Sequence, residues 1–124
     1  MVKFGDLIYS QEEAPSQAIS KAETHTPKIE APDVVKKGEP FKVKISVGPH
    51  EMKTHHSIRY VEIWVEEEGR PFNPVRVGKV EFEPEYTEPV AEITMKIQKP
   101  VTLYVISYCN LHGLWEARKK INVE

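Results

Sequence analysis

Hydrophobic and polar residues alternate one by one along several short segments of this chain. In the segment 41–47, F-K-V-K-I-S-V, every odd position is apolar and every even position is polar. The same period of two recurs in 61–65 and in 91–97, where apolar residues again occupy the odd positions. This pattern is typical of β-strands that bury one face and expose the other to solvent. The segment 101–108, V-T-L-Y-V-I-S-Y, is apolar on both faces, which predicts a central strand.

Three further segments complete the predicted strands. Residues 75–82 alternate with a change of phase near Gly78, which indicates a β-bulge, and residues 117–123 alternate to the end of the sequence. A short strand is expected over 28–30. The ten prolines lie mostly between these segments, where a missing backbone N–H disturbs no sheet. About seven short strands at regular spacing predict an all-β fold, an immunoglobulin-like antiparallel β-sandwich.

The first part of the chain lacks this alternation. We expect residues 1–22 to form an N-terminal tail with little regular structure, apart from one helical turn around Ser16–Lys21. Residues 23–124 then form a single domain, because a chain of 124 residues has the usual size of one domain.

Composition and charge narrow the classes of function. A net charge of −2, with both signs interspersed, provides neither a basic surface for nucleic acid nor a polybasic membrane anchor. No apolar run approaches the roughly 18 residues of a transmembrane helix, and the first ten residues lack the apolar core of a signal peptide. A single cysteine can form no internal disulfide, so we expect a reducing, cytoplasmic location.

All the histidines lie between the predicted strands. They occur in E-T-H-T-P, in the loop G-P-H-E-M-K-T-H-H and in the turn after the central strand, and they are His25, His50, His55, His56 and His112. Cys109, the only cysteine, precedes His112 by three residues, which is chelating distance. Loops at the ends of strands are where such a scaffold usually carries its function. The pattern therefore favours a metal site over scattered surface histidines.

Four imidazoles and one thiolate limit which metal can bind. A structural zinc site normally has four ligands and often two or more thiolates, so five ligands are one too many. Blue copper uses two histidines, a cysteine and a weak axial methionine, but no methionine follows Cys109. Iron in a plane of four imidazoles, with an axial thiolate and an open sixth position, fits these residues better. A cysteine nucleophile activated by histidine is another alternative, but no oxyanion hole or acid partner can be named for it.

Three segments resemble the iron-binding segments of superoxide reductases, specifically the one-iron neelaredoxin class. They are E-T-H-T-P at 23–27, H-x5-H-x-I-R-Y at 50–60 and S-Y-C-N-L-H-G-L-W-E at 107–116. The resemblance covers roughly residues 20–124, and its Cys-Asn-x-His-Gly motif is specific. Two-iron members have an additional N-terminal domain with four cysteines, and this sequence has no such cysteines.

The resemblance implies one mononuclear non-haem iron per chain, which reduces superoxide to hydrogen peroxide. Four equatorial histidines and one axial cysteinate would bind it, and the matching residues are His25, His50, His56, His112 and Cys109. His56 is chosen over His55 because the second loop ligand of the family lies six residues after the first. Glu23 matches a glutamate that takes the sixth position in the ferric form. The resemblance also implies a rubredoxin-like electron donor and a homotetramer.

Two positions depart from the family pattern. The family usually has a lysine directly before the first histidine, which is credited with attracting superoxide, and here this residue is Thr24. It also tends to have proline after the first loop histidine, where Glu51 here adds negative charge near a site for an anion. Lys21 and Lys53 are the nearest substitutes for the lysine, and Lys21 is favoured because it shares a segment with the first histidine.

Two other functions remain open on the residues alone. One is a cupredoxin-like copper carrier, which would transfer electrons without turning over a substrate. The other is a zinc-binding module without catalysis.

Overall fold

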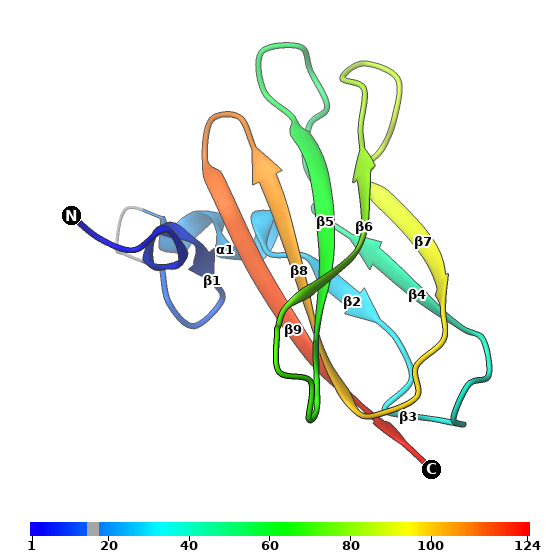
Figure 1. Ribbon diagram of the computed structural model, residues 1–124. Coiled ribbons are helices and arrows are strands. Elements are labelled where there is room, and N and C mark those ends of the chain that lie inside the picture. Colours follow the sequence, from blue (N-terminus) through cyan, green and yellow to red (C-terminus); the bar gives the residue numbers. More distant parts are fainter. Residues whose placement is uncertain (15–17) are drawn as a thin grey trace.

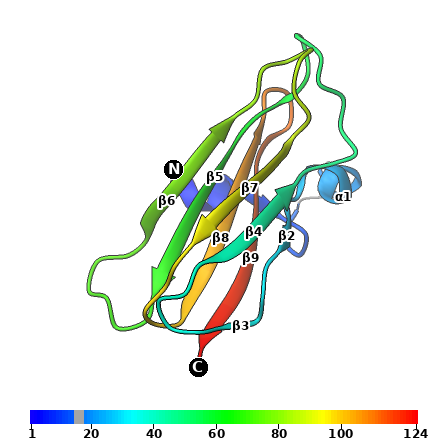
Figure 2. The same cartoon turned by 90° about the vertical axis from the view of Figure 1, so that its right-hand side faces the viewer.

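The computed structural model describes residues 1–14 and 18–124, which form a sandwich of two β-sheets (Figure 1). The larger sheet has the order β1-β9-β8-β5-β6, with β3 also paired to β9, and the smaller sheet has the order β2-β4-β7. The strands of the larger sheet are β1 (Tyr9–Ser10), β3 (Val34–Val35), β5 (Ile58–Glu67), β6 (Val75–Glu81), β8 (Val101–Cys109) and β9 (Gly113–Val123). Those of the smaller sheet are β2 (Lys28–Glu30), β4 (Phe41–Ser46) and β7 (Val90–Met95). In Figure 2 the smaller sheet lies in front of the larger one.

The strands follow the alternation in the sequence. Seven of those described have three or more residues, which confirms the predicted sandwich of about seven strands. The predicted short strand at 28–30 is β2. The expected bulge near Gly78 is also confirmed, because the β5–β6 register shifts where Ile63 pairs with Gly78 and Trp64 pairs with Arg76.

The hydrophobic core lies between the two sheets. The central strand β8 pairs with β5 on one side and with β9 on the other, and its odd-numbered residues are buried. Core side chains that are at most 1% exposed include Val43, Ile45, Ile58, Val61, Ile63, Val101, Leu103, Val105 and Ile121. Full burial of one such side chain stabilises the fold by roughly 1.5–3 kcal/mol.

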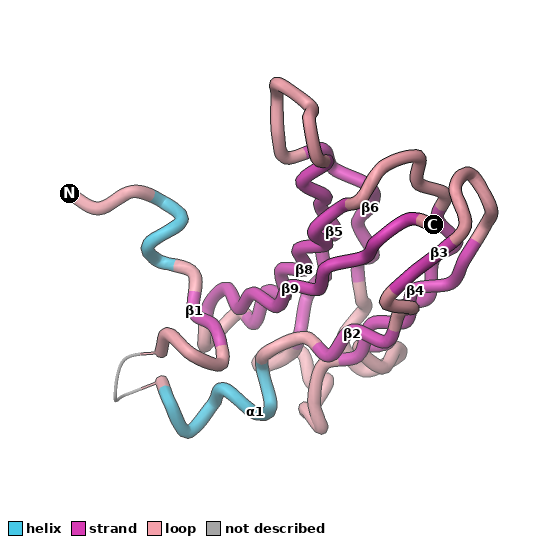
Figure 3. The backbone as a smooth tube through the Cα atoms, turned by 90° about the horizontal axis from the view of Figure 1, so that it is seen from below, coloured by secondary structure: helices cyan, strands magenta, loops and turns pink. Residues whose placement is uncertain are grey.

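The N-terminal segment reaches the edge of the larger sheet at β1, and the residues before β1 extend away from the sandwich (Figure 3). A 3-10 helix, η1 (Phe4–Leu7), precedes β1, which pairs in parallel with β9. The Tyr9 ring lies 5.0 Å from that of Trp115, so an aromatic contact accompanies the pairing. Alternation did not indicate this strand, because two residues are too short for a periodic signal. The predicted helical turn at Ser16–Lys21 lies partly outside the described residues, and η2 (Ile19–Lys21) occupies its described end.

Three loops lie at the same end of the sandwich, the upper end in Figure 1. They are residues 47–57 between β4 and β5, 82–89 between β6 and β7, and 110–112 between β8 and β9. The single-turn helix α1 (Ala22–His25) lies beside this end. All the histidines of the chain therefore belong to this end of the molecule. In the described part of the chain, no helix combines the length and the apolarity that crossing a membrane requires.

Candidate metal centre

Four separate segments bring histidine and cysteine side chains together. His25 ends α1 and is 3% exposed, and Cys109 ends β8 and is fully buried. His50 and His56 belong to the 47–57 loop, and His112 lies in the turn between β8 and β9. Cys109 lies at the end of a strand, and the histidines lie in segments attached to strand ends. The sheets therefore determine where these side chains lie.

The four imidazole rings form a square. In the order His25, His50, His56 and His112, neighbouring ring centroids lie 4.5–5.0 Å apart, and the planes meet at 67–89°. Across the square, the rings of His25 and His56 are 6.4 Å apart and nearly parallel, with 24° between their planes. The four rings therefore surround one common centre.

The distances between the donor atoms fit one metal ion. Donor atoms of His25, His50, His56 and Cys109 all lie within 4.8 Å of one another. The Nε2 atoms of His25 and His50 are 3.1 Å apart. Two nitrogens at right angles, each about 2.1 Å from an ion, would be about 3.0 Å apart. Cys109 Sγ lies 3.7 Å from His50 Nε2 and also 3.7 Å from His112 Nδ1. His112 is not among the four residues whose donor atoms all lie within 4.8 Å of one another, and it adjoins them through the thiol and through its ring.

Hydrogen bonds to the Nδ1 atoms of His25, His50 and His56 determine which ring nitrogen faces the centre of the square. His25 Nδ1 lies 3.0 Å from the Lys21 carbonyl and 2.8 Å from Thr24 Oγ1. His50 Nδ1 donates to the Glu51 carbonyl, and His56 Nδ1 donates to a carboxylate oxygen of Glu51, each at 2.6 Å. His56 Nε2 is buried and has no hydrogen-bond partner among the described residues. A buried polar atom without a partner is costly, so this nitrogen fits a metal ligand.

Burial favours the neutral form of three of these imidazoles, those of His25, His50 and His112, by lowering their pKa values. Burial, together with the charge of His50, lowers the pKa of His25 to about 4. Burial is also the largest cause that lowers the pKa values of His50 and His112, and the nearby positive charge of Lys21 contributes to both. Metal binding requires neutral imidazoles, because a protonated ring has no free lone pair.

Several contacts fix the 47–57 loop. Gly48 has a φ of +127°, and a Cβ atom there would lie 2.6 Å from the backbone nitrogen of His50, so the turn requires glycine. Glu85, in the left-handed region at φ +74°, donates its N–H to the Met52 carbonyl at 2.7 Å. Its carboxylate accepts hydrogen bonds from Thr54 N and Thr54 Oγ1 at 2.8 and 3.2 Å. Glu85 therefore holds this loop from the neighbouring 82–89 loop.

Asn110 and Trp115 tie the cysteine turn to its surroundings. Asn110 Nδ2 donates to the His55 carbonyl, and Asn110 Oδ1 accepts from the Ser57 N–H, both at 2.9 Å. Trp115 Nε1 donates to the His112 carbonyl at 3.0 Å. The two Asn110 bonds join the segment with Cys109 and His112 to the loop with His50 and His56, and the Trp115 bond holds the turn that carries His112.

The other candidates of the sequence lie around this centre in different ways. His55 is exposed. Its backbone carbonyl accepts a hydrogen bond from Asn110 of the Cys-Asn-x-His-Gly motif. Glu23 is exposed and lies outside the group of donor atoms, since residues two apart on a helix do not face the same side. Lys21 is half-buried and borders a cavity together with His112. Lys53 Nζ lies 3.8 Å from the Glu85 carboxylate.

Three residues that support the centre are not among those predicted from the sequence. Ser107 is fully buried and donates to the His25 carbonyl, and a polar residue at an inward position of the apolar segment 101–108 was a usable signal. Asn110 lies inside the Cys-Asn-x-His-Gly motif, which was also a signal. Glu85 offered none, because its contacts are with residues about 30 positions away.

Comparisons with known proteins agree with this geometry. The model of the desulfoferrodoxin family matches residues 17–118. The superoxide reductase of Pyrococcus furiosus is 42% identical over 111 residues, which cover 77% of this chain and 86% of that protein. The neelaredoxin of Megalodesulfovibrio gigas is 34% identical, with 82% of this chain and 88% of that protein covered.

Solved structures show the same fold. A superoxide reductase (neelaredoxin) from Ignicoccus hospitalis is 61% identical, with a TM-score of 0.93 and with 99% of this chain and 100% of that chain covered. Its variants E23A and T24K have TM-scores of 0.98 and 0.94, and this chain also has glutamate at position 23 and threonine at position 24. In sequence and in fold, this chain belongs to the desulfoferrodoxin family.

Proposed function

We propose that this protein is a superoxide reductase that converts superoxide to hydrogen peroxide at one iron per chain. The proposed ligands are His25 Nε2, His50 Nε2, His56 Nε2, His112 Nδ1 and Cys109 Sγ. The square of four imidazole rings beside a buried thiol carries the proposal, because it offers five ligands and leaves one position open. The superoxide reductases and the neelaredoxin that the chain matches support the same activity.

The residues around the centre suit a small anionic substrate. Bound iron would supply the electron that superoxide accepts, and the reaction consumes one electron and two protons for each hydrogen peroxide formed. Cys109 is fully buried on the core side, so superoxide has to approach from the opposite face of the imidazole square. The loops that carry His50 and His112 lie at the end of the sandwich, where water can deliver the protons.

Lys21 is the better substitute for the lysine that Thr24 replaces. It borders a cavity of about 440 Å³ together with His112, and its charge acts on His50 and His112. The ammonium group of Lys53 instead faces the Glu85 carboxylate at 3.8 Å, which offsets its charge. We infer that Lys21 attracts superoxide to the open face.

Glu23 is proposed as a displaceable sixth ligand of the oxidised metal. It is exposed in this structure, so reaching the metal requires the single turn of α1 to rearrange. That turn has only four residues, and its last backbone bond runs from Thr26 N to the Ala22 carbonyl at 3.0 Å. Glu23→Ala should change the spectrum of the oxidised protein and leave the first reaction with superoxide nearly intact. An unchanged oxidised spectrum at every pH would exclude Glu23 as a ligand.

Metal analysis combined with visible absorption tests the identity of the metal. Iron with a thiolate charge-transfer band in the oxidised protein is expected. An intense blue copper–thiolate band would favour the cupredoxin-like carrier, and colourless zinc protein would favour a module without catalysis. The activity itself is tested by mixing the reduced protein with superoxide, which should yield hydrogen peroxide and oxidised protein in equal amounts.

The electron has to come from an external donor, because the centre has one metal and no second redox group. A rubredoxin-like donor is proposed from the family resemblance. A reducing, cytoplasmic location is proposed because the one cysteine is a free thiol. We also propose that residues 23–124 form the single iron-binding domain.

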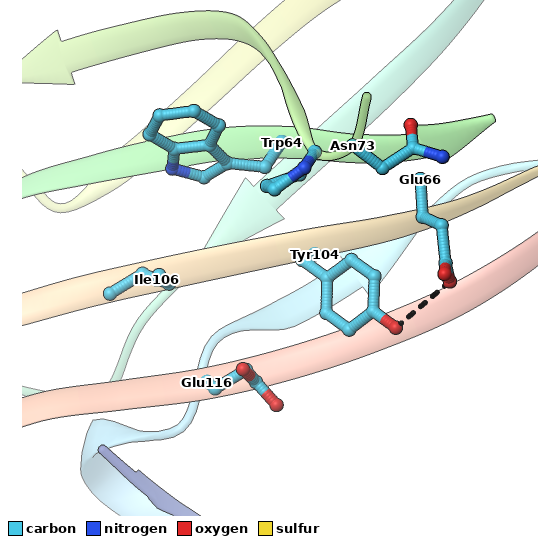
Figure 4. A pocket seen from close by; sticks show the side chains of 7 residues that line it. Trp64, Glu66, Asn73, Tyr104, Ile106 and Glu116 are labelled. Carbon is cyan, nitrogen blue, oxygen red and sulfur yellow. Dashed lines mark hydrogen bonds between the residues drawn. The ribbon is translucent and has the colours of Figure 1, made fainter. Parts of the chain in front are cut away.

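A homotetramer is proposed from the same resemblance, and the outer face of the larger sheet supports it. There Trp64, Tyr104 and Ile106 border a cavity of about 370 Å³ with Glu66 and Glu116, as Figure 4 shows. These half-buried apolar side chains face away from the core, and surfaces of this kind commonly mark protein contacts. Light scattering should give the mass of a tetramer for the wild type and a smaller mass for Trp64→Lys. A monomeric wild type would exclude the tetramer.

A further inference from the structure

Glu51 contacts both histidines of the 47–57 loop through two different oxygen atoms. Its backbone carbonyl accepts a hydrogen bond from His50 Nδ1, and its carboxylate accepts one from His56 Nδ1, each at 2.6 Å. With the protons held on the Nδ1 atoms, the Nε2 atoms of both rings keep their lone pairs for the centre of the square. One residue thus determines the tautomer of two of the proposed ligands.

The contact with His56 differs from those of the neighbouring rings. His25 Nδ1 contacts a carbonyl and a hydroxyl, and His50 Nδ1 contacts a carbonyl, so these partners are neutral. His56 has a carboxylate partner, and its own side chain is only 16% exposed. A hydrogen bond to an ionised acceptor is shorter and roughly twice as strong as a neutral one.

The carboxylate lies where the related motif tends to have proline, a residue that has no acceptor in its side chain. The sequence suggested only that Glu51 adds a negative charge near a site for an anion. In the structure this charge lies against the outer nitrogen of His56, while the inner nitrogen of the same ring is buried and without a partner. Glu51, which replaces the proline of the motif, therefore makes a specific contact with His56 Nδ1.

We propose that Glu51 is a positioning residue of the metal centre, which orients His56 through its carboxylate and His50 through its carbonyl. The inference rests on the proposed iron site and deepens it. A carboxylate that accepts the outer N–H of a ligating histidine fixes the ring and makes it a stronger electron donor. The negative charge also stabilises the oxidised metal, which has the higher positive charge.

Two variants separate orientation from charge. Glu51→Ala removes the acceptor, and Glu51→Gln keeps an amide oxygen that can accept from His56 Nδ1 but removes the charge. Glu88→Gln is the matched control, because Glu88 is exposed and borders the same cavity as Glu51, and its side chain makes no hydrogen bond with the described residues. The His50–Glu51 carbonyl contact is a backbone contact and remains available in all three variants.

The measurements are the ferrous-ion affinity of the metal-free protein, by competition with a chelator, and the reduction potential of the loaded protein. Glu51→Ala should bind ferrous ion about 10–100-fold more weakly than the wild type. Glu51→Gln should keep most of the affinity and have a higher potential, and Glu88→Gln should match the wild type in both quantities. Glu51→Ala with wild-type affinity and a potential equal to that of Glu88→Gln would overturn the role of Glu51. A wild type that binds no ferrous ion would instead refute the proposed function.

Discussion

Ser107 Oγ donates a hydrogen bond of 2.8 Å to the carbonyl oxygen of His25, in the buried interior and across 82 residues of sequence. This bond joins the central strand β8 to the single turn that carries the first histidine. Cys109 follows Ser107 on the same face of β8, so the strand supports the histidine with one side chain and offers a thiol with the next.

Ser107→Ala should lower the free energy of unfolding by about 1–3 kcal/mol, because the His25 carbonyl is left buried without its donor. Urea unfolding of the metal-free protein measures this loss. Ser57→Ala is the matched control, since Ser57 is equally buried and its hydroxyl has no partner among the described residues. Equal losses in the two variants would contradict a specific role for the Ser107 bond.

His56→Ala should bind far less iron than His55→Ala, although the two residues are adjacent. The ring of His56 belongs to the square of imidazoles, whereas the ring of His55 is exposed and lies outside it. The metal content of the purified variants measures the difference. The same iron content in both would contradict the choice of His56 as the ligand.

Glu85→Gln should destabilise the protein at neutral pH and have little effect in acid. The backbone N–H of Thr54 is the main cause that lowers the pKa of the Glu85 carboxyl below its usual 4.5. Folding therefore favours the charged form of Glu85. Its contribution to the stability of the folded protein is complete above pH 4.5, the pKa of the unfolded state, and is lost as the pH falls through the lower folded pKa. Urea midpoints of the wild type and the variant should differ at neutral pH and converge once the pH is below the lowered folded pKa of Glu85. A difference that persists in acid would show that the charge is not the cause.

Lys21→Ala should slow the association of superoxide and weaken the dependence of the rate on salt, and Lys53→Ala should change neither. A charge attracts an anion only within about one Debye length, roughly 8 Å at physiological ionic strength, and the Glu85 carboxylate offsets the charge of Lys53. Stopped-flow rates at two salt concentrations measure both effects. Thr24→Lys should add only a modest gain, since a positive charge is already present. A large gain, or wild-type rates in Lys21→Ala, would mean that Lys21 does not replace the missing lysine.

The sequence by itself determined the strands and the chelating pairs. Alternation predicted strands at 41–47, 61–65 and 101–108, because a strand turns successive side chains to opposite faces whatever the rest of the chain does. The spacing of Cys109 and His112 likewise predicted a compact pair, and the structure has them 3.7 Å apart between Sγ and Nδ1. Strands and a pair of ligands three residues apart depend on residues that are close in sequence, so the sequence alone can predict them.

Only the tertiary structure decided how distant segments meet. It brought His25 to His50, ordered the four rings into a square, and placed Lys21 at the same cavity as His112 while Lys53 faces Glu85. It also determined the partner of His56, because Glu51 could equally have remained a free surface charge. These outcomes depend on packing the two sheets and their loops against one another, and the free energy of that packing is shared among residues far apart in sequence. No local pattern of residues encodes it.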